Sequence, residues 1–156
     1  MLDVKELSDI IKDRYEGDYL DFKATQYKDN MNLIKDVLAM ANSFSELTKY
    51  IICGIKVKPN NEKEIQGIDS NEFKDSAELQ QLIYSNIEPD LHIEYLSFEY
   101  EGKLLGIIKI ENGDNRPYIL KKDFGSLKKG LCYVRKGSHQ TAASREDFDR
   151  FYFLKV

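Results

Sequence analysis

Residues 133–138 carry the side chains best suited to bind a phosphate group. An apolar strand is followed there by two cations, a glycine and a hydroxyl, in the order Tyr-Val-Arg-Lys-Gly-Ser. Gly137 permits backbone angles that other residues avoid. The amides around it, the Ser138 hydroxyl and the cations Arg135 and Lys136 form a candidate phosphate cradle. The alternative is a hairpin end with solvated charges, which is common in loops.

A second polar segment lies far upstream. Glu16 precedes a predicted strand over residues 19–24, in which Asp21 and Lys23 alternate with apolar residues. Because side chains two apart in a strand lie on one face, Asp21 and Lys23 can act on a single site. The alternative is that Glu16 and Asp21 are solvated acids beside a strand, and that Lys23 is a surface lysine.

Charge is distributed unevenly along the chain. The net charge is −4, which argues against a broadly basic coat for nucleic acid. Residues 116–136 carry seven lysines and arginines against one acid, so this window sums to +6 and the remainder to −10. Arg116, Lys128 and Lys129 belong to this window. The asymmetry favours one positive face on an acidic body.

The length of 156 residues fits one domain over residues 1–156 with its own core. No apolar run approaches the roughly 20 residues that span a bilayer, and the charged N-terminus is not a signal peptide. These features predict a cytoplasmic protein without membrane contact. Cys53 and Cys132 lie in apolar runs and are expected to be buried free thiols. The two histidines, His92 and His139, form no local metal motif.

Hydrophobic periodicity predicts a mixture of helices and strands. Helices are expected over residues 3–15, 29–43, 71–86 and 144–154, the last opened by Ser144 with Asp147 as a near match to a capping box. Strands are expected over residues 19–24, 50–55, 65–68, 91–100, 103–110, 118–120 and 131–135. Glu101-Gly102 predicts a two-residue hairpin. Because the elements do not alternate strictly, the predicted class is α+β, a mixed central sheet with flanking helices.

Several short motifs occur in a recognisable order. They are Glu16; Asp21-Phe22-Lys23; the helix end Ala39-Met40-Ala41-Asn42-Ser43; the strand Ile51-Ile52-Cys53-Gly54-Ile55; Ile65-Gln66-Gly67-Ile68; Ile87-Glu88-Pro89; Arg116-Pro117-Tyr118; Tyr133-Val134-Arg135-Lys136-Gly137-Ser138; and Thr141-Ala142-Ala143. This series resembles the Schlafen-type (AlbA-like) DNA-binding domain over roughly residues 10 to 150. The resemblance implies a Schlafen-core-like fold that recognises nucleic acid.

In some members the resemblance also implies metal-dependent cleavage of structured RNA, often in antiviral or antiphage defence. Glu16 and Asp21 match two of three acids in those nucleases and would be catalytic metal ligands for Mg²⁺ or Mn²⁺. Lys23 would stabilise charge on the phosphate. The third acid has no counterpart, because Lys56 and Lys58 follow the expected strand end. Glu62 or Glu64 could substitute for it.

Three functions follow from these observations. The first is a module that binds RNA or DNA through the basic strand-end loop, with Lys23, Arg116, Lys128, Lys129, Arg135, Lys136 and Ser138 as contacts, and with Tyr118 or Tyr133 stacking on unpaired bases. The second is a metal-dependent endoribonuclease. The third is a protein-interaction or regulatory domain, which is favoured by the net charge of −10 outside residues 116–136. A homodimer or a partner protein is compatible with each.

Overall fold

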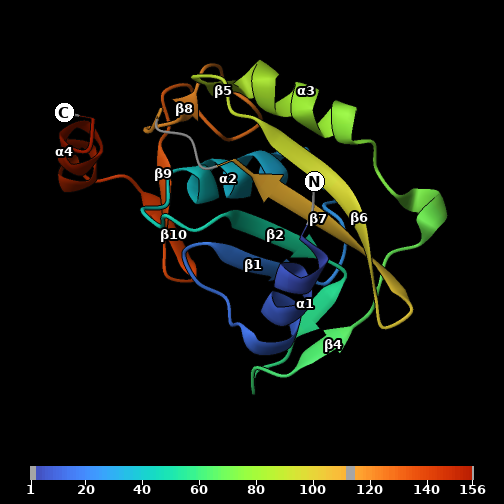
Figure 1. The fold of residues 1–156 in the computed structure, drawn as a ribbon. Helices are drawn as coiled ribbons and strands as arrows, with labels where there is room; N and C mark the ends of the chain where they lie inside the picture. The colour runs from blue at the N-terminus through green and yellow to red at the C-terminus, as the bar shows by residue number, and fades with distance from the viewer. Residues whose placement is uncertain (1–2, 112–114, 156) are drawn as a thin grey trace.

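A four-stranded mixed sheet forms the centre of the molecule in this computed structural model, which describes residues 3–111 and 115–155 (Figure 1). Its strands are β1 (Leu20–Lys23), β2 (Lys49–Cys53), β6 (Ile93–Tyr100) and β7 (Lys103–Ile110). They lie in the order β1-β2-β7-β6. The pair β1–β2 is parallel, whereas β2–β7 and β6–β7 are antiparallel. This arrangement confirms the predicted α+β class.

The helix α1 (Val4–Asp13) covers one face of the sheet. Asp3 caps the helix by accepting a hydrogen bond from the Glu6 amide at 3.1 Å. Residues three and four apart in α1 then bury one stripe, Leu7, Ile10 and Ile11, against apolar side chains of β1, β2, β6 and β7.

Two further helices cover the other face, α2 (Asn30–Ala41) and α3 (Ser76–Asn86). Asp29 caps α2 by accepting from the Met31 amide at 2.8 Å. Their apolar stripes pack on Ile51, Ile108 and Tyr95 of the sheet and form the largest cluster of buried side chains.

A smaller unit lies beside α2. It comprises the antiparallel pair β9 (Tyr133–Lys136) and β10 (His139–Ala142), followed by α4 (Arg145–Phe153). Ser144 and Asp147 form the predicted capping box at the start of α4. Phe151 of α4 packs on Cys132 and Val134 and stacks on Phe44, with ring centroids 4.6 Å apart.

The remaining pairs are short. The pair β3 (Ile55–Val57) and β4 (Lys63–Ile65) extends from one end of the sheet. The pair β5 (Ile87–Glu88) and β8 (Ile119–Leu120) lies near α3. A single 3₁₀ turn, η1 (Ser70–Glu72), precedes α3.

Most predicted elements are present, with four instructive differences. The strand predicted over residues 65–68 is β4, which spans Lys63–Ile65 and ends before Gly67, whose φ is +77°. The predicted strand 50–55 is divided at Gly54, whose φ of +106° breaks the extended backbone. The helix predicted from residue 71 begins at Ser76, because the Asp75 side chain caps it there. The strands β5 and β10 were not predicted, since neither has an alternating apolar pattern. The Glu101-Gly102 turn is confirmed, with φ of +50° and +73°.

No helix within the described residues is long and apolar enough to cross a bilayer.

Candidate functional site

The acidic strand β1 and the cationic strand β9 meet through Arg135. Its Nη2 atom lies 3.5 Å from Asp21 Oδ1. The same guanidinium donates to two main-chain oxygens, from Nε to Gly17 at 2.6 Å and from Nη2 to Leu20 at 3.1 Å. Arg135 is only 5% exposed. The expectation that Arg135 contacts a phosphate directly therefore conflicts with its burial, and its observed role is to join β9 to β1.

Glu16 and Asp21 form a hydrogen-bonded acid pair beside Arg135. Burial and a hydrogen bond to Asp21 raise the pKa of Glu16 to about 7, although the Phe22 amide donates to Glu16 at 3.1 Å. Burial opposes ionisation of Asp21 as well. For Asp21, however, the hydrogen bond from Glu16 and the charges of Arg135 and Lys23 prevail and lower its pKa. The pair therefore takes up a proton on Glu16 as the pH falls through about 7.

Lys23 lies between two carboxylates, one of which the sequence did not single out. Its Nζ is 3.2 Å from Asp21 Oδ2 and 3.2 Å from Asp36 Oδ2 on α2. Burial alone would lower the pKa of Lys23, but these two charges raise it above its usual value. Asp36 also accepts from the Tyr27 hydroxyl and from Gln140 Nε2, each at 2.6 Å. In the sequence, Asp36 could have been noticed only as an acid that directly precedes Val37, a residue of the apolar stripe of α2.

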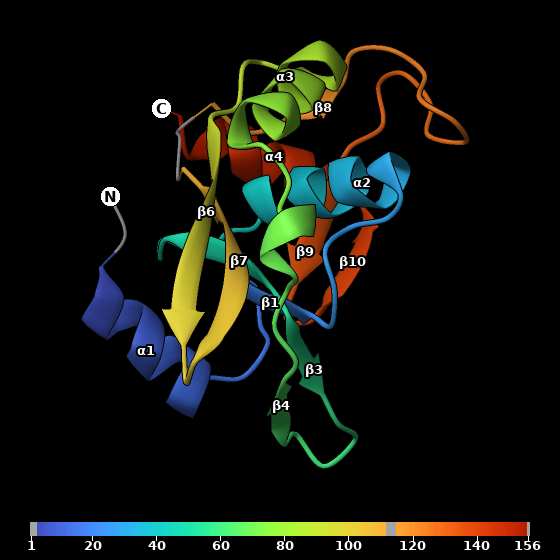
Figure 2. The same ribbon diagram turned by 90° about the vertical axis from the view of Figure 1, so that its right-hand side faces the viewer.

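Residues 121–131 fold into a basic hairpin that rests on α2. Phe124 and Leu127 exchange main-chain hydrogen bonds at 2.9 Å. Asp123 accepts from the Lys129 amide at 2.8 Å. Ser126 Oγ lies 3.2 Å from Met31 Sδ in the first turn of α2. Lys128 and Lys129 are exposed on this hairpin. The hairpin, drawn in orange, lies on the same side of the molecule as α2 and β10 (Figure 2).

An aromatic ring and a cation lie side by side near this hairpin. Lys35 Nζ is 4.9 Å from the centre of the Tyr133 ring, and both side chains are half-buried. Lys35 is one turn after Met31, so it shares the helix face that carries the hairpin. Of the two tyrosines expected to stack on bases, Tyr118 is only 2% exposed and belongs to the core. Its burial leaves Tyr133 as the accessible one of the two.

The other predicted contacts lie toward α4. Lys136 Nζ is 2.8 Å from Asp147 at the start of α4. Arg116 is half-buried and donates from Nη1 to the Ser43 main-chain oxygen at 2.5 Å. Ser138 is exposed in the β9–β10 turn. Because neighbouring side chains of β9 point to opposite faces, Lys136 lies on the α4 side and Tyr133 and Arg135 on the α2 and β1 side. The predicted contacts therefore do not form one continuous patch.

Asn42 joins these parts at the C-terminus of α2. It is fully buried. Its Nδ2 donates to the main-chain oxygens of Tyr118 at 2.9 Å and Tyr133 at 2.8 Å, and its Oδ1 accepts from the Tyr118 amide at 2.7 Å. Asn42 is also the C-cap residue of α2. It is thus a structural clamp between α2 and the segments at residues 118 and 133.

A comparison with known proteins identifies the same family as the series of sequence motifs. The family model described as Schlafen, AlbA_2 matches residues 16–144. The chain belongs to this family. A search of curated proteins found no match.

Two solved structures show the same fold as this Schlafen AlbA_2 domain. One is the N-terminal domain of a RecG-related protein from Nitrosomonas europaea, with a TM-score of 0.55 and 17% identity, covering 83% of this chain and 89% of that chain. The other is the DIP2311 protein from Corynebacterium diphtheriae, with a TM-score of 0.60 and 15% identity, covering 95% of this chain and 27% of that chain.

The acid pair of this Schlafen AlbA_2 domain does not fit the divalent ion that the resemblance implies. A cation would have to displace protons from Glu16, whose pKa is raised to about 7, and also the ammonium of Lys23, which lies between Asp21 and Asp36. A hard cation needs several unprotonated oxygens around it. Within the part of the chain that the structure describes, no third acid, histidine or cysteine completes a ligand group with Glu16 and Asp21. Glu64 is on β4 and lies 3.9 Å from Lys58, so it does not supply the third acid.

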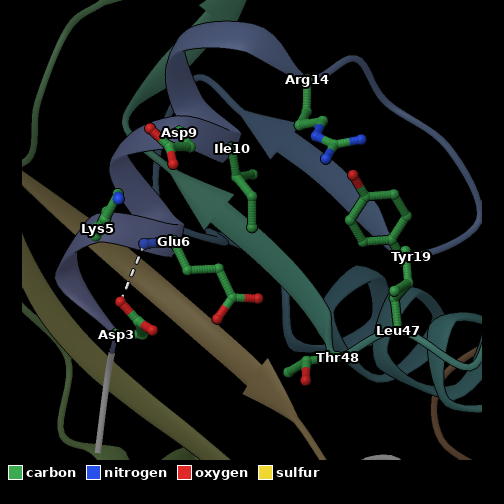
Figure 3. A pocket seen from close by; sticks show the side chains of 9 residues that line it. All are labelled: Asp3, Lys5, Glu6, Asp9, Ile10, Arg14, Tyr19, Leu47 and Thr48. Atoms are coloured by element: carbon green, nitrogen blue, oxygen red, sulfur yellow. Dashed lines mark hydrogen bonds between the residues drawn. The ribbon is translucent and has the colours of Figure 1, made fainter.

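A separate pocket on the α1 side of the domain suits phosphate poorly. It has a volume of about 350 Å³ and lies between α1 and the segments that lead into β1 and β2 (Figure 3). Three carboxylates, of Asp3, Glu6 and Asp9, line it against the cations Lys5 and Arg14. Since α1 and α2 cover opposite faces of the sheet, this pocket is also remote from the basic hairpin.

Proposed function

We propose that this domain binds RNA or DNA on a basic face formed by the hairpin 121–131, α2 and β9. The basic face is defined by Lys35, Lys122, Lys128, Lys129 and Tyr133. The observation that supports the proposal is the contact between Ser126 and Met31, which holds the hairpin on the first turn of α2, one turn before Lys35 of the Lys35–Tyr133 pair. Family membership and the likeness in fold to a RecG-related protein support the same general function.

The chemistry of the basic face suits a sugar–phosphate chain. Lysine ammonium groups attract phosphates and release condensed counterions, so the affinity of such a surface falls steeply with salt. A tyrosine ring beside them offers a stacking surface for an unpaired base. The rest of the chain is acidic and repels the polyanion, which confines binding to this face.

The proposal is tested by fluorescence polarisation with labelled RNA and DNA, single- and double-stranded, over a range of salt concentrations. The variant carries Lys128→Ala and Lys129→Ala. Each lysine that contacts a phosphate should contribute about one unit to the salt slope, so the double variant should lower the slope by about two and weaken binding about tenfold or more at low salt. Tyr133→Ala should weaken binding to single strands more than to duplexes.

A matched control carries Lys56→Ala and Lys103→Ala, two exposed lysines of β3 and β7 that lie outside the basic face. Its affinity and salt slope should equal those of the unmodified protein. Equal losses in both double variants would mean that only the total charge matters, and the basic face would be rejected. Absence of binding to every nucleic acid would favour the protein-interaction function instead.

A further inference from the structure

Three side chains with metal-ligand chemistry meet at the open end of the β6–β7 hairpin. They are His92, Glu94 and Glu111. One ligand atom from each lies within 4.8 Å of the other two, and no other such group of three occurs within residues 3–111 and 115–155. The site is distinct from the acid pair at Glu16 and Asp21 and from the basic face.

The register of the hairpin brings the three together. His92 and Glu94 are two residues apart along the start of β6 and therefore share one face of the sheet. Ile93 pairs with Ile110, so the next residue, Glu111, lies opposite His92. The Glu111 amide donates to the His92 main-chain oxygen at 3.3 Å, which fixes this position. The grouping thus follows from strand pairing and was invisible as a local sequence motif.

The imidazole of His92 is held from both sides. Its Nε2 lies 3.8 Å from Glu94 Oε1. Its Nδ1 lies 3.5 Å from the Tyr84 hydroxyl of α3, the reach of a long hydrogen bond. A metal-bound histidine usually makes such a contact with its other ring nitrogen, which orients the ring. The opposite charge on this face is Lys109, whose place in β7 is paired in register with Glu94.

We propose that His92, Glu94 and Glu111 bind a divalent transition-metal ion, with Zn²⁺ as the best match. One imidazole and two carboxylates suit Zn²⁺, whereas Mg²⁺ prefers oxygen ligands alone. Around a tetrahedral ion with bonds of about 2.0–2.1 Å, ligand atoms lie about 3.3 Å apart. The ligand atoms now lie within 4.8 Å of one another. Small rotations of the side chains, of which His92 and Glu111 are exposed, would bring these atoms to the shorter spacing. The fourth position would be left to water or to an exogenous ligand.

The test is titration of the whole chain, without a histidine tag, with Zn²⁺ in competition with a fluorescent chelator. We expect one ion per chain and an increase in melting temperature on binding. His92→Ala should weaken Zn²⁺ binding at least about tenfold, and Glu111→Gln should also weaken it. His139→Ala is the matched control, because His139 is the other histidine of the chain and is exposed on β10. It should bind Zn²⁺ as the unmodified protein does.

A ring-nitrogen NMR spectrum gives a second readout that does not depend on how well the variants fold. Zn²⁺ should shift the nitrogen resonances of His92 and leave those of His139 in place. The proposal is overturned if Zn²⁺ shows no saturable binding, if His92→Ala binds as tightly as the unmodified protein, or if both histidines shift equally.

Discussion

Arg135 and Asp21 lie in contact across the interface between β9 and β1, with Nη2 and Oδ1 3.5 Å apart. The contact brings the late cationic segment and the early acidic segment of the chain to one place. It also removes Arg135 from the surface, because the guanidinium is committed to Asp21 and to two main-chain oxygens.

Arg135→Ala should therefore act first on stability. Removing the guanidinium takes one ion-pair partner from buried Asp21 and a hydrogen-bond donor from the Gly17 and Leu20 carbonyl groups, so we expect a loss of about 3 kcal/mol in the free energy of unfolding. Urea denaturation measures it. Lys136→Ala is the matched control, since its half-exposed ion pair with Asp147 should contribute less than about 1 kcal/mol. Unchanged stability in Arg135→Ala together with lost nucleic-acid binding would restore Arg135 as a direct contact.

Glu16→Gln should alter how stability depends on pH. Burial raises the pKa of Glu16 from 4.5 to about 7 in the fold, so between these values the folded state binds more protons than the unfolded state. The contribution of Glu16 to stability therefore falls as pH rises from about 4.5 through 7. Glutamine is neutral at every pH. The free energy of unfolding of the variant should therefore equal that of the unmodified protein at pH 5 and exceed it by about 1 kcal/mol at pH 8.

Urea denaturation at the two pH values provides the comparison for Glu16→Gln. Asp21 has a lowered pKa, so its own stabilising contribution is lost only as pH falls through that value, below the tested range. Glu99→Gln, at an exposed acid of β6, is the control and should show no such pH-dependent gain. A Glu16→Gln variant that is less stable than the unmodified protein at pH 8 would argue against a raised pKa of Glu16.

The stability of Lys49→Met relative to the unmodified protein should also depend on pH, with a sign opposite to that of Glu16→Gln. Lys49 is fully buried at the start of β2 and donates to the main-chain oxygens of Ala41 at 3.1 Å and Ser43 at 2.8 Å. Burial, and then the charge of Arg116, lower its pKa from 10.5 to about 7. The unfolded state therefore binds more protons between pH 7 and 10.5, and the contribution of Lys49 to stability rises across that window.

The variant lacks this rise and removes the ammonium donor from the Ala41 and Ser43 carbonyl groups, of which Ser43 keeps the guanidinium of Arg116 as a partner. We expect Lys49→Met to be about 2 kcal/mol less stable than the unmodified protein at pH 9.5, with a smaller difference at pH 6. Chemical denaturation at both pH values measures the change, and Lys103→Met at an exposed lysine serves as the control. A difference that is equal at both pH values would show that Lys49 is buried with its charge unaltered.

The elements of the fold were largely predictable because their signals are local. Apolar residues three and four apart marked α2, Ser144 marked the start of α4, and Glu101-Gly102 marked the β6–β7 turn. The short strands β5 and β10 lacked such a signal. They exist because the neighbouring segments, β8 and β9, offer main-chain partners.

The residues of the candidate site were partly predictable from the sequence, but some of the roles predicted for them were wrong. The sequence placed Glu16, Asp21 and Lys23 near one another, and the structure brings them to Arg135. It did not identify Asp36 or Lys35, since both are ordinary charged residues of a helix until β1 and β9 pack beside them. Tyr118 was a candidate stacking residue by its type, and its burial excludes it from that role.

The sequence by itself determined the family, the fold class and the unequal distribution of charge, because these depend on residue order, periodicity and composition. Only the tertiary structure decided which charged side chains face solvent and which are enclosed. Arg135 and Lys49 are cations that residue type alone places at the surface, yet both are buried against main-chain oxygens. Burial and partner geometry are set by contacts between segments distant in the chain, and those contacts determine which groups keep their charge and which remain available to a ligand.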